Sequence, residues 1–213
     1  MDSALLLSLI GFAFVALMTP GPNNLLLMSS GALFGFRATL PHIVGIQLGF
    51  ATVMTSAVLG LGALLEAWPA LLIVMKIVGA GWLSYMALLF LITAVRSSGT
   101  ETANPDLTRG TETEVLSRPF RFHEAVLFQW VNLKAILIAI STAGAYSELS
   151  PNLSARAAAT AAVFISMGFL SSISWAKLGS VLQRFMSGGT SAILLNAAMG
   201  LLLLGTAGMI LFA

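Results

Sequence analysis

Six long apolar stretches determine what this chain can fold into. They cover residues 4–33, 43–65, 70–95, 125–146, 157–176 and 193–212. A helix of about 20 apolar residues crosses a hydrocarbon layer about 30 Å thick. A transmembrane β-barrel would instead show strands of about ten residues with alternating polarity. Because the stretches are continuously apolar, the sequence predicts an all-α integral membrane protein with six transmembrane helices.

The composition excludes several other classes of protein. Apolar residues make up 58% of the 213 residues and charged residues 8%, whereas soluble proteins carry about 25% charged residues. The absence of cysteine excludes disulfides, thiolate metal sites and cysteine nucleophiles. Two histidines, His42 and His123, are too few and too dispersed to predict a metal site. We therefore expect no metal, no cofactor and no nucleic-acid partner.

One polar segment divides the single expected transmembrane domain, 1–213, into two halves. Residues 97–119 have the composition of a solvated cytoplasmic loop. The first three-helix half is 1–96 and the second is 120–213. Three helices per half make the halves run in opposite senses, as in the inverted-topology repeats of many secondary transporters. The topology permits such a repeat without proving it.

Basic residues are concentrated in the connections on one side of the membrane, which predicts that this side is cytoplasmic. This side contains Arg37, Arg96, Arg109, Arg118, Arg121, Lys177 and Arg184. The other side contains Arg156, Asp2, Glu66 and Glu148, with Lys76 near its edge. Both termini are therefore expected outside.

A polar interruption, Thr19-Pro20-Gly21-Pro22-Asn23-Asn24, lies inside the first expected helix. Two prolines and a glycine predict a kink or break. A new helix beginning near Pro22 would offer free N–H groups and a positive dipole end to a substrate carboxylate. The amides of Asn23 and Asn24 would lie beside them. In the alternative interpretation, the asparagines cap backbone groups that a proline kink sets free.

A second polar cluster, Gln129, Asn132 and Lys134, lies in the fourth expected helix. A charge at the bilayer centre costs about 2.5–3.5 kcal/mol or more, and no carboxylate lies inside an expected helix. The partner of Lys134 could be an external anion, backbone carbonyls or the Asn132 side chain. Lys134 would then bind the substrate carboxylate or take part in proton movement. The alternative is a lysine satisfied by the carbonyl ends of broken helices.

These two clusters lie in the first helix of each half, and such paired interruptions indicate a transport site. Gln47, in the second expected helix, is a further candidate for substrate contact, although one intramembrane glutamine often joins helices instead. Gly31/Gly35 and Gly45/Gly49 have the small-xxx-small spacing of helix packing.

Three segments carry more specific motifs. They are TPGPNNLLLMSSGALFGFRATLPHIVGIQLGF (19–50), GAGWLSYMALLFL (79–91) and FQWVNLKAILI (128–138). They resemble the N-terminal signature, the third helix and the Asn-Pro-Lys segment of the LysE/RhtB family of amino-acid exporters, with Leu133 in place of the usual proline. This difference and SISWAKLGSVLQRF (172–185) look most like the branch of cysteine and O-acetylserine exporters.

The resemblance implies six helices in the bacterial inner membrane and export of amino acids or close derivatives, driven by the proton gradient. It also implies functional roles for Pro20, Gly21, Pro22, Asn23, Asn132 and Lys134. An exporter of lysine or arginine should offer an intramembrane carboxylate. None is present, so a small neutral substrate of the cysteine/O-acetylserine or threonine/homoserine kind is favoured. The expected partners are this amino acid and membrane lipid, and a homo-oligomer stays open.

Two other functions are alternatives to transport. An intramembrane enzyme needs a nucleophile with a base, or a metal, inside a helix. The expected helices offer serines and Lys134 but no carboxylate or histidine to activate them, so we expect no enzyme. A non-transporting scaffold predicts that alanine at Asn23 or Lys134 changes partner binding but not solute flux.

Overall fold

The computed structural model describes residues 1–99, 118–185 and 189–212, and helices form nearly all of this part of the chain. The α-helices are α1 (Ser3–Met18), α2 (Pro22–Phe34), α3 (Phe36–Ser56), α4 (Gly62–Ala67), α5 (Pro69–Gly99), α6 (Phe122–Phe128), α7 (Leu133–Ala145), α8 (Leu153–Phe185) and α9 (Gly189–Phe212). A π-helical turn (Ala57–Leu61) joins α3 to α4, and a 3-10 turn (Ser147–Leu149) precedes α8. The predicted all-α fold is confirmed. Most of the predicted loop 97–119 lies outside the described residues.

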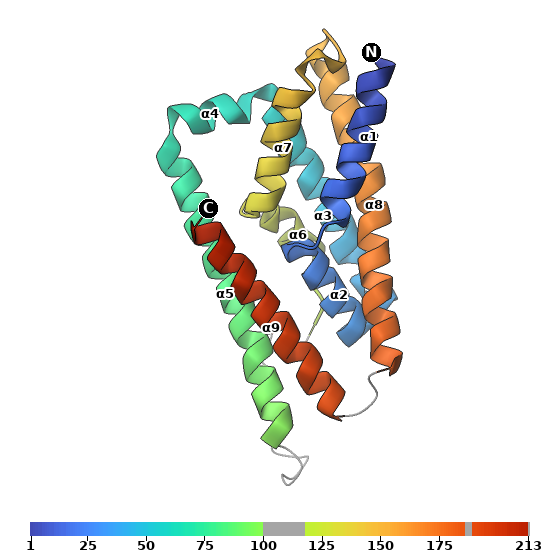
Figure 1. The fold of residues 1–213 in the computed structure, drawn as a ribbon, viewed down its shortest axis with the longest axis vertical. Coiled ribbons are helices and arrows are strands. Elements are labelled where there is room, and N and C mark those ends of the chain that lie inside the picture. The colour runs from blue at the N-terminus through green and yellow to red at the C-terminus, as the bar shows by residue number, and fades with distance from the viewer. Residues whose placement is uncertain (100–117, 186–188, 213) are drawn as a thin grey trace.

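The described helices account for the expected crossings. Three stretches are long and apolar enough to cross a membrane: Phe36–Ala67, which is kinked at Gly60, Pro69–Val95 and Leu153–Leu182. Two bent pairs also qualify, α1 with α2 and α6 with α7. The sixth expected crossing, 193–212, lies within α9. In Figure 1, α1, α2, α5 and α8 run downward and α3, α7 and α9 upward, so corresponding helices of the two halves have opposite directions.

The first crossing is broken where the sequence predicts it. α1 and α2 meet at an angle of 57°. The last N–H bond of α1 runs from Thr19 to the Val15 carbonyl, and α2 begins with Pro22 in its first turn. Pro20 and Pro22 have no N–H to continue the helical ladder, so the break follows from the sequence.

The second crossing starts earlier than its apolar stretch. The stretch begins at residue 43, whereas α3 begins at Phe36 and includes Pro41. Hydropathy marks only the apolar part of a helix, and the helix here starts directly after Gly35. This glycine has φ +81°, a left-handed conformation that allows the sharp turn from α2 into α3. It therefore serves the turn rather than the packing spacing predicted for Gly31/Gly35.

Close helix contacts join the two halves at glycines. A Cβ on Gly49 of α3 would lie 2.6 Å from the Val126 carbonyl oxygen of α6. A Cβ on Gly31 of α2 would meet the Ala176 carbonyl oxygen of α8. Small residues let backbones approach closely in membrane proteins. Each half therefore packs its broken helix against the second crossing of the other half, and α5 and α9 pack side by side (Figure 1).

The outer surface of the bundle is strongly apolar. Exposed large side chains include Leu7, Val15, Leu48, Leu59, Trp68, Ile73, Ile77, Leu127, Leu194, Leu201 and Met209. In water such a surface would drive aggregation, whereas lipid tails are as apolar as these side chains. The surface agrees with a protein embedded in a bilayer.

Candidate functional site

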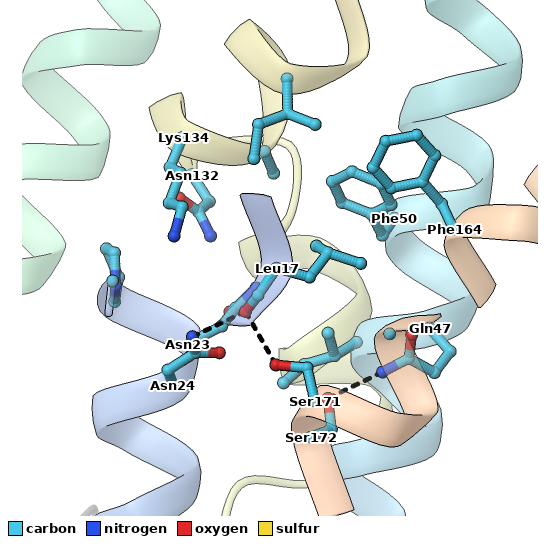
Figure 2. Close-up of a pocket in the computed structure, with 16 residues that line it drawn as sticks. Leu17, Asn23, Asn24, Gln47, Phe50, Asn132, Lys134, Phe164, Ser171 and Ser172 are labelled. Atoms are coloured by element: carbon cyan, nitrogen blue, oxygen red, sulfur yellow. Dashed lines mark hydrogen bonds between the residues drawn. The ribbon is translucent and has the colours of Figure 1, made fainter. Parts of the chain in front are cut away.

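A narrow cavity lies where the two broken crossings meet (Figure 2). Its volume is about 40 Å³, and a single buried water needs about 10–15 Å³. It is lined by Leu17, Gly21, Pro22, Asn23, Asn24, Ile46, Gln47, Phe50, Asn132, Lys134, Ala135, Ile138, Phe164, Gly168, Ser171 and Ser172. These residues come from α1, α2, α3, α7 and α8 and from the two breaks, so both halves build the cavity.

The structure brings together seven of the eight residues that the sequence singles out. Gly21, Pro22, Asn23, Asn24, Gln47, Asn132 and Lys134 line this cavity. Pro20 lines a wider neighbouring cavity of about 710 Å³, whose walls are mostly apolar side chains of α1, α2, α7 and α9. Gly21, Pro22, Lys134 and Ile138 border both cavities.

Lys134 reaches from the second break to the first. Its Nζ donates to the Thr19 carbonyl oxygen at 2.5 Å and lies 3.4 Å from the Pro20 carbonyl oxygen. Of the three partners considered for this lysine, the structure has the backbone carbonyls. The Lys134 side chain crosses Gly21 closely, since a Cβ there would lie 2.8 Å from its Cδ and 3.0 Å from its Nζ.

Asn23 occupies the corresponding position in the other half. It is the second residue of α2, as Lys134 is the second residue of α7. Asn23 Nδ2 donates to Gln129 Oε1 at 2.8 Å, and Gln129 Nε2 donates back to Asn23 Oδ1 at 3.2 Å. Each second residue thus reaches the end of the helix before the opposite break.

Asn24 contacts the end of α1, in its own half, rather than the other half of the molecule. Its Nδ2 donates to the carbonyl oxygens of Leu17 and Thr19, both at 2.9 Å. This is the geometry of the alternative in which an asparagine caps freed backbone groups. Ser171 of α8 also donates its hydroxyl to Leu17 O, at 2.7 Å (Figure 2).

The α8 residues of the cavity are not among the predicted site residues, because its serines read from the sequence as packing residues. Gln47 of α3 donates its Nε2 to Ser172 Oγ at 2.9 Å (Figure 2). Its Oε1 lies against Gly168, where a Cβ would collide with it. Ser171 and Ser172 are almost fully buried, 2% and 4% exposed. Two adjacent serines inside an apolar helix were a usable signal, since hydroxyls in lipid need partners.

Asn132 provides an acceptor that no group uses. It lies in the second break and is 3% exposed. Its Oδ1 is buried and has no hydrogen-bond partner, although the side chain lines the cavity beside Lys134 (Figure 2). A buried amide oxygen without a donor is costly, so a donor brought close to this atom would stabilise it.

The cavity combines complementary charges from helix ends and one side chain. Lys134 is the only ionisable side chain among the described residues that line it. The first turns of α2 and α7 have unpaired N–H groups that favour anions, and the carbonyl end of α1 favours cations. Within the described residues, no three His, Asp or Glu side chains gather as metal ligands. The arrangement therefore suits a small molecule with both a positive and a negative end.

The proteins that are similar to this chain include translocators. A family model described as LysE type translocator matches residues 14–213. An uncharacterized membrane protein of Pseudomonas aeruginosa is 35% identical over 133 residues, and the chain spans 58% of its length. Two cysteine/O-acetylserine efflux proteins of Escherichia coli are 25% and 24% identical over 173 residues, 81% of this chain and of each relative. No solved structure matches the chain significantly.

Proposed function

The chain belongs to the LysE type translocator family, and we propose that it exports small neutral amino acids or close derivatives from the bacterial cytoplasm. Transport, rather than a scaffold or an enzymatic role, is supported most by one observation. The two broken crossings meet at a single cavity, where Asn23 and Lys134 hold equivalent positions. Broken helices that meet at one site are typical of the substrate sites of secondary transporters.

The residues that line the cavity favour a substrate with a neutral side chain. Apart from Lys134, the described lining residues are apolar, amide or hydroxyl groups, and none is acidic. A second positive charge on the substrate would lie near the lysine without a carboxylate to pair with. Phe50 and Phe164 leave little room, which favours a short side chain. The similarity to cysteine/O-acetylserine efflux proteins makes L-cysteine and O-acetyl-L-serine our first candidates, with threonine and homoserine next.

In the transport cycle that we propose, the N–H groups of α2 and the Lys134 ammonium bind the substrate carboxylate. Asn23, Gln47 and Asn132 supply further polar contacts. Movement of one half against the other opens the cavity alternately to each side of the inner membrane. In the orientation that we propose, both termini lie outside, because the basic connections are expected on the cytoplasmic side. The proton gradient drives export, and Lys134 is the ionisable group at the site that can take part in proton movement.

A panel of labelled amino acids in inverted vesicles tests this function. Uptake into such vesicles corresponds to export from a cell. We expect uptake of O-acetylserine or cysteine, faster with an imposed pH gradient, and no uptake of lysine or arginine. Vesicles that accumulate none of the small neutral amino acids, at a verified level of protein in the membrane, would contradict the proposal.

A further inference from the structure

The position of Lys134 in this cavity suggests how the substrate is recognised. Its ammonium is bound by the Thr19 carbonyl oxygen at 2.5 Å, with the Pro20 carbonyl oxygen at 3.4 Å. Both carbonyls follow the C-terminal end of α1, which carries a partial negative charge. A primary ammonium with three N–H donors is the chemical group that these carbonyls hold in this structure.

The Asn132 side chain lines the same cavity and has an acceptor without a partner. Asn132 Oδ1 is buried without a partner in a side chain that is 3% exposed and lines the same cavity. Buried polar atoms are rarely left without partners, and exceptions are frequent at functional sites. The two carbonyls and this amide oxygen are three acceptors, which is the number that a group with three N–H donors can use.

We propose that Lys134 occupies, in the empty transporter, the place of the substrate's own α-ammonium. This inference rests on the proposed function and deepens it. The substrate ammonium takes the Thr19 and Pro20 carbonyls and Asn132 Oδ1. The Lys134 ammonium then moves away and pairs with the substrate carboxylate. The substrate must therefore carry a free primary amine as well as a carboxylate.

The charges explain why this exchange suits a membrane interior. An isolated ammonium or carboxylate is expensive in a low-dielectric environment. Before the exchange the α1 carbonyls hold one ammonium, and afterwards they hold another. The displaced Lys134 is paired at once, because the zwitterion brings the carboxylate with it. No step leaves an unpaired charge, whereas an amine without a carboxylate would leave Lys134 without a partner.

The structure leaves room for the lysine to move. Its stem crosses Gly21, the position without a side chain. Lys134 also borders both cavities, so its side chain has open space on two sides. A four-carbon stem with rotatable bonds is suited to such movement.

Replacing the lysine should empty the ammonium site for other amines. In purified full-length Lys134→Met, ethylammonium should bind the vacated acceptors and raise the temperature of thermal unfolding by about 3 °C at tenfold excess over its Kd. The wild type should show no such rise, because its own lysine fills the site. Tetramethylammonium has the same charge but no N–H, and should have no effect on either protein.

The variant Lys76→Met is the matched control, since Lys76 of α5 lines neither described cavity. It should behave like the wild type towards ethylammonium. An equal ethylammonium effect on wild type and Lys134→Met, or no effect on Lys134→Met, would overturn the exchange. Export is a separate readout: wild-type protein that exports no small neutral amino acid contradicts the proposed function, whereas loss of export in Lys134→Met without amine binding contradicts only the exchange.

A second variant does not depend on the lysine. Asn132→Leu keeps the branched shape of the side chain but removes the third acceptor, and should weaken O-acetylserine binding about tenfold. Inhibition by the substrate analogue propionate, which has no amine, should be equally weak in both proteins. Unchanged O-acetylserine affinity in folded Asn132→Leu, or propionate that competes as well as the amino acid, would also overturn the exchange.

Discussion

The two breaks bend the chain by almost the same angle through different means. α1 and α2 meet at 57°, and α6 and α7 at 59°. The first break contains Pro20, Gly21 and Pro22, which remove the helical N–H groups directly. The second contains no proline, and Leu133 begins α7. The second break must therefore be held by interactions with other parts of the molecule.

Those interactions are visible around Gln129. The backbone N–H groups of residues 129, 130 and 131 bond three residues back, which tightens the end of α6. The Gln129 N–H therefore does not bond four residues back to the Ala125 carbonyl oxygen, and Gln129 Nε2 donates to that oxygen instead, at 3.0 Å. Gly79 of α5 lies directly against the Val131 carbonyl oxygen. The first break is therefore local, because its own prolines cause it, and the second is tertiary, because contacts with other helices hold it. Single substitutions should affect the second break more.

The largest effect is expected for Gln129→Leu. It leaves the Asn23 side chain and the Ala125 carbonyl without their partner, so the free energy of unfolding should fall by about 2–4 kcal/mol. Export should be nearly lost. Denaturant titration in micelles and vesicle uptake measure both. In the double variant Asn23→Leu/Gln129→Leu the loss should be smaller than the sum of the two single losses; additive losses would show that the pair does not matter.

Gly79→Ala should have the next largest effect. A Cβ here collides with the Val131 carbonyl oxygen, and overpacking costs about 1–3 kcal/mol. The matched control is Gly81→Ala, because a Cβ on Gly81 has no neighbour within 4 Å. Thermal unfolding of the two variants in one detergent gives the comparison. Equal unfolding temperatures would mean that α5 does not support the second break.

Asn24→Leu should cost less, about 1 kcal/mol. Leu17 O keeps the Ser171 hydroxyl and Thr19 O keeps Lys134 Nζ, so each carbonyl of the first break retains a donor. The prolines also keep the helix broken. Denaturant titration of Asn24→Leu and Gln129→Leu under the same conditions compares their free energies of unfolding. A loss at Asn24 as large as the loss at Gln129 would refute the distinction between a local and a tertiary break.

Leu133→Pro should have the smallest effect. Residue 133 is the first of α7, where proline is tolerated, and Asn132 before it is extended with φ −81° and ψ 97°. Proline packs less well than leucine, but it also lowers the conformational entropy of the unfolded chain. The two effects on the free energy of unfolding should nearly cancel, within about 1 kcal/mol, and uptake should persist. Ile136→Pro is the control, since its N–H donates to Asn132 O at 3.1 Å. If Leu133→Pro were as harmful as Ile136→Pro, α7 would begin elsewhere.

The same distinction explains what the sequence could predict. The first break follows from Pro20, Gly21 and Pro22 alone, and the polarity of Asn23 and Lys134 singles them out in an apolar chain. The second break could not be foreseen from Leu133, because Gly79 and Gln129 act through space. Ser171 and Ser172 join the cavity only because α8 packs on α2 and α3. Asn24 contacts freed carbonyls, a choice that polarity alone does not decide.

The rate of O-acetylserine uptake by inverted vesicles containing Lys134→Met tests the central claim most directly. We expect the uptake rate of this variant to be about a hundredfold lower than that of the wild type, since a charged group with its hydrogen bonds is removed from the site. Lys76→Met, at the same level in the membrane, should stay within about twofold of wild type because Lys76 lines neither described cavity. Uptake by Lys134→Met at the wild-type rate would contradict the role of Lys134 in substrate binding.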